Sequence, residues 1–201
     1  MLIAQISDTH IVAPETLAYG VVDTRKFFAQ ALEALHGLPQ KPDLVIVTGD
    51  LTDNGTPEEY AHLKALLRET ALPIFLINGN HDDRDTFLES FADAGYLPAA
   101  GNHAHYVIED WPVRIVMADS TMLDWHAGEF CDARCDWLDR TLAADRNRPT
   151  IVALHHPPFM TGISWMDGNG VAWADGLRAV IARHPQVKLV TCGHIHRPIQ
   201  R

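Results

Sequence analysis

Short apolar runs alternate along this chain with segments in which apolar residues recur at helical spacing. The helical segments predict helices at residues 23–35, 57–68, 86–94, 132–143 and 173–182. The short runs predict strands at residues 2–6, 44–47, 74–77, 106–108, 113–118, 151–154 and 187–191. This order predicts an α/β layered fold with several buried parallel or mixed strands.

Local signals fix some of the element boundaries. Thr56, Pro57 and Glu59 form an N-cap, a first-turn proline and a capping-box partner, so a helix is expected to begin at Pro57. Gly95 is expected to end the helix at 86–94. The strands at 106–108 and 113–118 are expected to pair as a hairpin around Trp111-Pro112.

Polar clusters follow five of the predicted strands. They are Asp8-Thr9-His10, Gly49-Asp50, Gly79-Asn80-His81-Asp82, His155-His156 and Gly193-His194-Ile195-His196. Ligands of α/β folds collect at the carboxyl ends of the strands, so these clusters are expected to form one site. Taken singly, each cluster also suits a turn, a cap or a loop hydrogen bond. A fold without function has no reason to place such residues at five strand ends.

The residue types in these clusters favour a metal site. Histidine mixed with carboxylate and amide oxygen suits Fe, Mn, Zn or Co, and the lack of a thiolate cluster excludes a zinc finger. The candidate ligands are too many for one ion and suit two ions that share Asp50 as a bridge. By formal count, two divalent ions, two carboxylates and one hydroxide leave about +1, which suits a phosphodiester monoanion.

Composition sets further limits. A chain of 201 residues with 47% apolar content is expected to form one domain over residues 1–201. Its formal charge of −10 argues against binding to duplex nucleic acid or to anionic membranes. The N-terminus is typical of a first strand, not of a signal peptide, and no run is long enough to span a membrane. We therefore expect a cytoplasmic protein with free cysteines.

In this order, the motifs D-x-H, GD, GNH-D, a strand-terminal His and GHxH resemble the calcineurin-like metallophosphoesterase superfamily. The residues that flank these motifs are similar to those of the class III cyclic nucleotide phosphodiesterases and the related bacterial glycerophosphodiesterases. The resemblance implies a four-layer α/β/β/α sandwich. It also implies a metal-dependent phosphoric diester hydrolase in which a metal-bound hydroxide attacks the phosphorus of cyclic nucleotides, such as 3′,5′-cAMP, or of glycerophosphodiesters.

The resemblance also implies a role for each site residue. The first metal would be held by Asp8, His10 and His196, the second by Asn80, His155 and His194, with Asp50 as the bridge. His155 is preferred to His156 as the ligand. His81 would contact the phosphate or protonate the leaving alkoxide, and Asp82 would orient His81. The expected cofactors are thus two divalent or trivalent ions.

Other features leave alternatives open. In the family further strands usually follow the GHxH motif, whereas this chain ends at Arg201, so we expect either a compact variant or one without its C-terminal strands. Homo-oligomerisation also stays open. The loop at 161–172, and more weakly Trp125 and His126, would form a pocket wall or a partner contact. Rival functions are a phosphomonoesterase, a nuclease and a non-catalytic interaction protein on the same fold.

Overall fold

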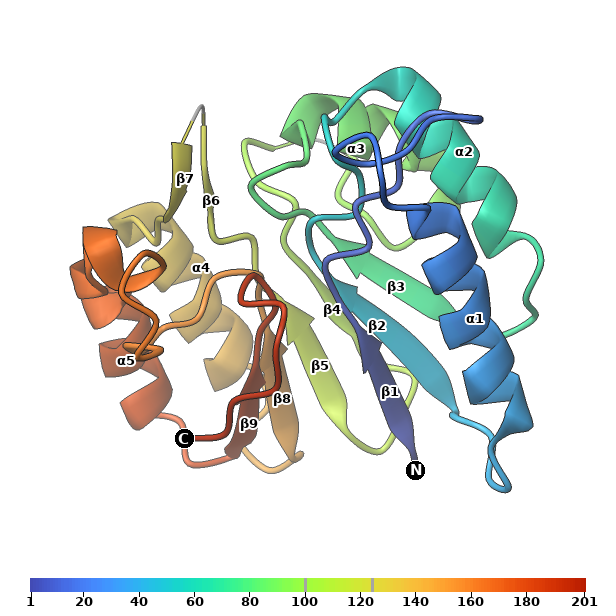
Figure 1. The fold of residues 1–201 in the computed structure, drawn as a ribbon. Coiled ribbons are helices and arrows are strands. Elements are labelled where there is room, and N and C mark those ends of the chain that lie inside the picture. The colour runs from blue at the N-terminus through green and yellow to red at the C-terminus, as the bar shows by residue number, and fades with distance from the viewer. Residues whose placement is uncertain (100, 124) are drawn as a thin grey trace.

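The computed structural model describes residues 1–99, 101–123 and 125–201. Two sheets lie face to face between two layers of helices, with α1, α2 and α3 outside the first sheet and α4 and α5 outside the second (Figure 1). This is the expected α/β/β/α sandwich.

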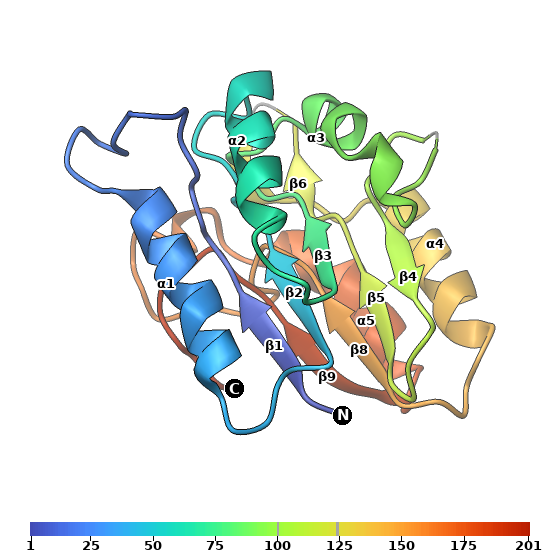
Figure 2. The same cartoon turned by 90° about the vertical axis from the view of Figure 1, so that its right-hand side faces the viewer.

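The first sheet contains three parallel strands in the order β1, β2, β3. Their bounds are Ile3–Ile6, Leu44–Thr48 and Ile74–Ile77. In the view turned by 90°, these strands lie side by side behind α1 and α2 (Figure 2). The helices that cover this sheet are α1 (Thr24–Gly37), α2 (Pro57–Leu67) and α3 (Arg84–Ser90), the last followed by a 3₁₀ turn at Ala92–Ala94.

The second sheet has the strand order β4, β5, β8, β9. These strands are Tyr106–Ile108, Arg114–Met117, Thr150–Ala153 and Val187–Thr191. The β4–β5 pair is antiparallel, as the predicted hairpin requires, and β5, β8 and β9 run parallel. Its outer face is covered by α4 (Asp132–Ala143) and α5 (Asp175–Ala182).

Alternation along β5 divides the core. Ile115 and Met117 pack with the first sheet, whereas Val116 packs with Leu138 of α4 and Leu177 of α5. Successive strand residues point to opposite faces, so one strand serves both cores. Strand β5 therefore joins the core between the sheets to the core beneath α4 and α5.

Most predicted elements are confirmed, with small shifts at their ends. The helix expected at 86–94 starts earlier, because the Asp83 side chain caps it by accepting from Thr86 N at 2.8 Å, and it gives way to the 3₁₀ turn before Gly95. Residues 172–174 also form a 3₁₀ turn, so the helix expected at 173–182 begins at Asp175. The predicted capping box between Thr56 and Glu59 is present.

One hairpin was not predicted. Strands β6 (Thr121–Met122) and β7 (Trp125–Gly128) pair antiparallel outside the main sheets. All three cysteines are free thiols. None of the helices in the described part of the chain combines the length and apolar composition of a bilayer span.

Candidate metal centre

The loops that leave β1, β2, β3, β8 and β9 meet at one end of the sandwich. Backbone hydrogen bonds continue the β1–β2 pairing into this region, from Asp8 N to Gly49 O at 3.0 Å and from His10 N to Asp50 O at 2.9 Å. Gly193 N donates to His155 O at 3.0 Å and joins the loops of the second sheet. The predicted ligand residues are thus brought together.

The first group of donors contains Asp8, His10, Asp50 and His196, whose ligand atoms lie within 4.8 Å of one another. His10 Nε2 lies 3.3 Å from His196 Nε2 and 3.7 Å from Asp50 Oδ2. His196 Nε2 lies 3.5 Å from Asp8 Oδ1. These are the four residues predicted for the first metal and its bridge.

The second group converges on His155 Nε2. This atom lies 3.0 Å from Asn80 Oδ1, 3.2 Å from His194 Nδ1 and 3.3 Å from Asp50 Oδ1. One ring nitrogen carries at most one proton, so it cannot satisfy three such neighbours at once. Two ligands of one cation, each bound at about 2.1 Å, lie roughly 3 Å apart. These spacings therefore fit a cation among the four groups.

Asp50 stands between the two groups. Its Oδ1 faces His155 and its Oδ2 faces His10. The backbone N–H of His81 donates to Oδ1 at 2.9 Å and fixes the carboxylate. With 2% of its surface exposed, Asp50 is held where a bridging ligand would lie.

The Nδ1 atoms of His155 and His10 point away from the donor groups, and their contacts orient the two rings. His155 Nδ1 lies 2.8 Å from Thr48 O, an acceptor, so this nitrogen carries a proton, and Nε2 is the nitrogen that can give up its proton to bind a metal ion. His10 Nδ1 lies 3.1 Å from Asp53 Oδ1 and is oriented in the same way. Both rings therefore offer Nε2 as a ligand. The donors present fit metal ions of the predicted kind.

Backbone strain is concentrated on the same residues. Among the described residues other than glycine, φ is positive at Asp8, His10, Asp50, His194 and His196 and at two further positions, Glu15 and Tyr19. This conformation costs free energy in residues with a Cβ, and it persists where the surroundings impose it. Strain at five of the predicted ligands indicates that the fold aims these side chains at a common centre.

The charges of the site support a cation. Burial opposes ionisation of His155, but the nearby Asp50 carboxylate outweighs it and raises the pKa of His155 to about 9. Burial likewise opposes ionisation of Asp50, yet His155 holds the pKa of Asp50 well below its usual value. Burial, together with His155, lowers the pKa of His194 to about 4. The site thus favours positive charge next to Asp50, which a bound cation would supply.

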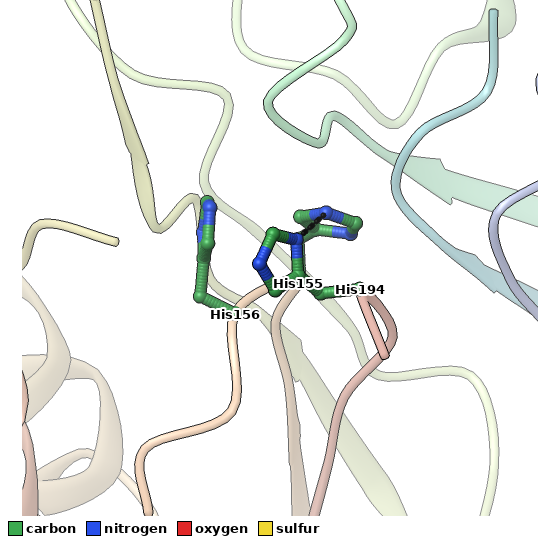
Figure 3. Close-up of side chains that lie close together, drawn as sticks. All are labelled: His155, His156 and His194. Carbon is green, nitrogen blue, oxygen red and sulfur yellow. Dashed lines mark hydrogen bonds between the residues drawn. The ribbon is translucent and has the colours of Figure 1, made fainter. Parts of the chain in front are cut away.

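His155 and His156 make different contacts: in Figure 3 a dashed line joins His155 to His194, and none reaches His156. His155 meets Asn80, Asp50 and His194, whereas His156 Nδ1 lies 3.0 Å from Ser120 Oγ. His156 Nε2 is buried and has no hydrogen-bond partner among the described residues. His156 shares a donor group with His155 and His194, but the Asn80 and Asp50 contacts support His155 as the ligand.

The structure corrects the predicted role of Asp82. His81 Nδ1 lies 2.9 Å from Asp53 O, so a backbone carbonyl orients this ring. The Asp82 carboxylate points inward and accepts from Leu51 N at 3.0 Å and Gly79 N at 2.8 Å. Thr52 and Tyr60 also donate to it. Asp82 therefore ties the Asp50 and Asn80 loops together and does not orient His81.

A cavity of about 410 Å³ opens beside the site. His81 and the candidate ligands Asn80 and His194 line it, and Trp165 and Trp173 form part of its wall. The expected pocket wall at 161–172 is thus in place. Trp125 is 57% exposed, whereas His126 lines the cavity and its Nδ1 lies 2.9 Å from Asn80 Nδ2. The hairpin β6–β7, which the sequence did not reveal, carries His126 to this position.

Comparison with known proteins places these features in context. Residues 1–198 match the model of a family described as calcineurin-like phosphoesterase. The chain is 36% identical to a probable glycerophosphodiester phosphodiesterase, GpdQ, of Arcobacter nitrofigilis, over 98% of this chain and 72% of the relative. It is 33% identical to the 3′,5′-cyclic adenosine monophosphate phosphodiesterase CpdA of Escherichia coli K12, over 98% and 70%.

A solved structure supports the fold. The purple acid phosphatase PPD1 from yellow lupin seeds superposes with a TM-score of 0.66, with 20% sequence identity over 96% of this chain and 37% of the lupin chain. At this level of identity the likeness concerns the fold alone.

Proposed function

The chain belongs to the calcineurin-like phosphoesterase family, and from that premise we propose that it hydrolyses small phosphodiesters with the help of metal ions. The observation that carries the proposal is the convergence of two donor groups on the two oxygens of Asp50. This arrangement matches the ligand set that the sequence motifs imply, and the family resemblance itself is confirmed by the comparisons.

We propose two ions drawn from Fe, Mn, Zn and Co, because mixed nitrogen and oxygen donors suit these metals. One ion would be held by Asp8, His10 and His196. The other ion would be held by Asn80, His155 and His194. Asp50 would bind both ions. Bound ions would neutralise the phosphate and supply a nucleophile at neutral pH.

The chain's own residues then position the ester. The Asp53 carbonyl holds His81 through Nδ1, which leaves Nε2 as the ring nitrogen for the substrate. In its imidazolium form, with both ring nitrogens protonated, His81 can donate a hydrogen bond or a proton from Nε2 to the departing oxygen. Trp165 and Trp173 in the cavity lining give the organic group an apolar surface to pack against.

A cavity of about 410 Å³ suits a small diester. Cyclic nucleotides and glycerophosphodiesters are the candidates, since relatives are named for both. We also propose that the protein acts as a single domain in the cytoplasm and does not bind duplex nucleic acid, in keeping with its charge of −10.

The test is hydrolysis of bis-p-nitrophenyl phosphate and mono-p-nitrophenyl phosphate, with added Mn²⁺ and with chelator. We expect diester cleavage that chelation abolishes. The same assay on 2′,3′- and 3′,5′-cyclic AMP and glycerophosphoethanolamine ranks the substrates. Activity that survives chelation, or that is confined to the monoester, contradicts the proposal.

A further inference from the structure

A second cavity of about 410 Å³ borders the first donor group. The cavity is lined by Asp8, His10 and His196 and by residues from the start of α1 and the loop before it. Its wall is mainly apolar and includes Ala18, Val22, Phe27, Phe28 and Ala31.

The two cavities meet at the candidate metal centre. Both are lined by His10, His196 and Tyr19, whereas Asn80 and His194 line only the first. A phosphate bound at these shared residues would therefore border both cavities. A phosphodiester carries two organic arms, one on each ester oxygen, which is the number of cavities available.

The second cavity has features of a ligand site. Thr24 lines it and is only 8% exposed, yet its hydroxyl has no hydrogen-bond partner among the described residues. A buried hydroxyl without a partner is unfavourable, and an alcohol or ether oxygen in the cavity would satisfy it. Phe27 is 61% exposed at the same cavity, so an aromatic surface is open to an apolar group.

We propose that this cavity is the subsite for the ester arm that stays on the phosphate after cleavage, and that it takes an apolar or aryl alcohol. The inference rests on the proposed function. His81 lines only the first cavity, so the departing arm is assigned there. A water oxygen joins phosphorus, the bond to the first arm breaks, and that arm leaves as an alcohol with a proton. The second arm leaves as the monoester.

The proposal favours acyclic diesters with two separate arms over cyclic diesters, whose single ring system fills one side. The first test compares bis-p-nitrophenyl phosphate with methyl p-nitrophenyl phosphate, which share a leaving group and differ in the retained arm. The variant Ala31→Leu narrows the second cavity. Ala34→Leu is the matched control, because Ala34 lies on the same helix, is exposed and does not line the cavity.

We expect Ala31→Leu to lower the ratio of kcat/KM for the bis ester to that for the methyl ester at least fivefold. Ala34→Leu should leave the ratio within twofold of the unmodified protein. An unchanged ratio in Ala31→Leu overturns the subsite. If neither ester is hydrolysed, the proposed function fails instead, and the binding measurement below still decides the subsite.

The second test needs no turnover. 4-Fluorobenzyl alcohol is titrated into the protein as purified, with its metal content left unchanged, and followed by ¹⁹F NMR. We expect saturable binding that weakens at least fivefold in Ala31→Leu and is unchanged in Ala34→Leu. Should Ala31→Leu not fold, Thr24→Val replaces it: losing the unpaired hydroxyl should keep or raise Tm while weakening the alcohol at least threefold. Binding that the folded cavity variant does not weaken, or no binding, contradicts the proposal.

Discussion

The buried ion pair between Arg84 and Asp119 gives a sharp prediction about how the site is supported. Arg84 Nε donates to Asp119 Oδ2 at 2.6 Å, and its Nη2 donates to Thr121 O at 2.9 Å. Asp119 is fully buried and also lies 3.4 Å from the side-chain nitrogen of Asn78, two residues before Asn80. We predict that Arg84→Met destabilises the fold and loosens the hairpin that carries His126.

The expected size follows from the surroundings of Asp119. Breaking a buried pair costs about 3–5 kcal/mol, because it leaves a charge without its partner. Arg134 stays close and Thr121 N still donates at 2.9 Å, so the loss should lie at the lower end of this range, about 3 kcal/mol at pH 7. Burial alone would raise the pKa of Asp119, but Arg84 and Arg134 lower it to about 2.

The pKa fixes how this loss depends on pH. The ionised carboxylate of Asp119 stabilises the fold fully above its ordinary pKa of 3.8, and the contribution is lost as pH falls through about 2. The difference in unfolding free energy between the unmodified protein and Arg84→Met should therefore be largest at pH 7 and should shrink between pH 4 and pH 2.

Urea unfolding followed by circular dichroism measures this difference. Arg146→Met is the matched control, because Arg146 is exposed, and it should change stability by less than about 0.5 kcal/mol. A loss in Arg84→Met no larger than in the control, or one that grows towards low pH, would refute the reasoning.

Three further predictions test other parts of the structure. Leu63→Ala, at a core position that is 1% exposed, should lower the unfolding free energy by about 2–4 kcal/mol in urea titration, and a loss below 1 kcal/mol would be inconsistent with the packing. Gly79→Ala places a methyl group against Asp50 N and Oδ1, so diester hydrolysis should fall at least a hundredfold, and retention of most activity would contradict the loop geometry. Chelation should lower Tm by about 5–10 °C, because ions bound only by the folded state stabilise it, and an unchanged Tm would argue against tight metal binding.

Much of the fold could be predicted from the sequence because its strands are short, apolar and β-branched. Leu44–Thr48, for example, is buried throughout, and a short apolar run of this kind is typical of a central strand in a layered fold. Placement of ligands at strand ends followed from the same alternation. The capping box at Thr56 and Glu59 was readable because both partners are close in sequence.

The hairpin β6–β7 was not predictable by the same means. Thr121–Met122 is too short to show a period, and its position depends on contacts of Thr121 with Asn78 and Arg84. These partners are distant in sequence and meet only in the folded chain. The place of His126 beside Asn80 follows from that tertiary contact.

The role of Asp82 could not be read from its neighbour. Adjacent His and Asp residues suggested an orienting pair, but the peptide turns the Asp82 carboxylate inward to backbone donors. The partner of His81 is the backbone carbonyl of Asp53. Every residue has such a carbonyl, so the sequence does not indicate which one accepts the hydrogen bond. The positive φ angles of Asp8 and His10 could not be predicted either, because they also depend on backbone contacts formed in the folded chain.

Metal stoichiometry tests the central claim most directly. Protein loaded with Mn²⁺ or Zn²⁺ and freed of excess metal should contain two ions per chain by elemental analysis. Asn80→Ala should retain one, because only the second donor group loses a ligand. Fewer than two ions in the unmodified protein, or two ions retained at unchanged affinity in Asn80→Ala, would contradict the account.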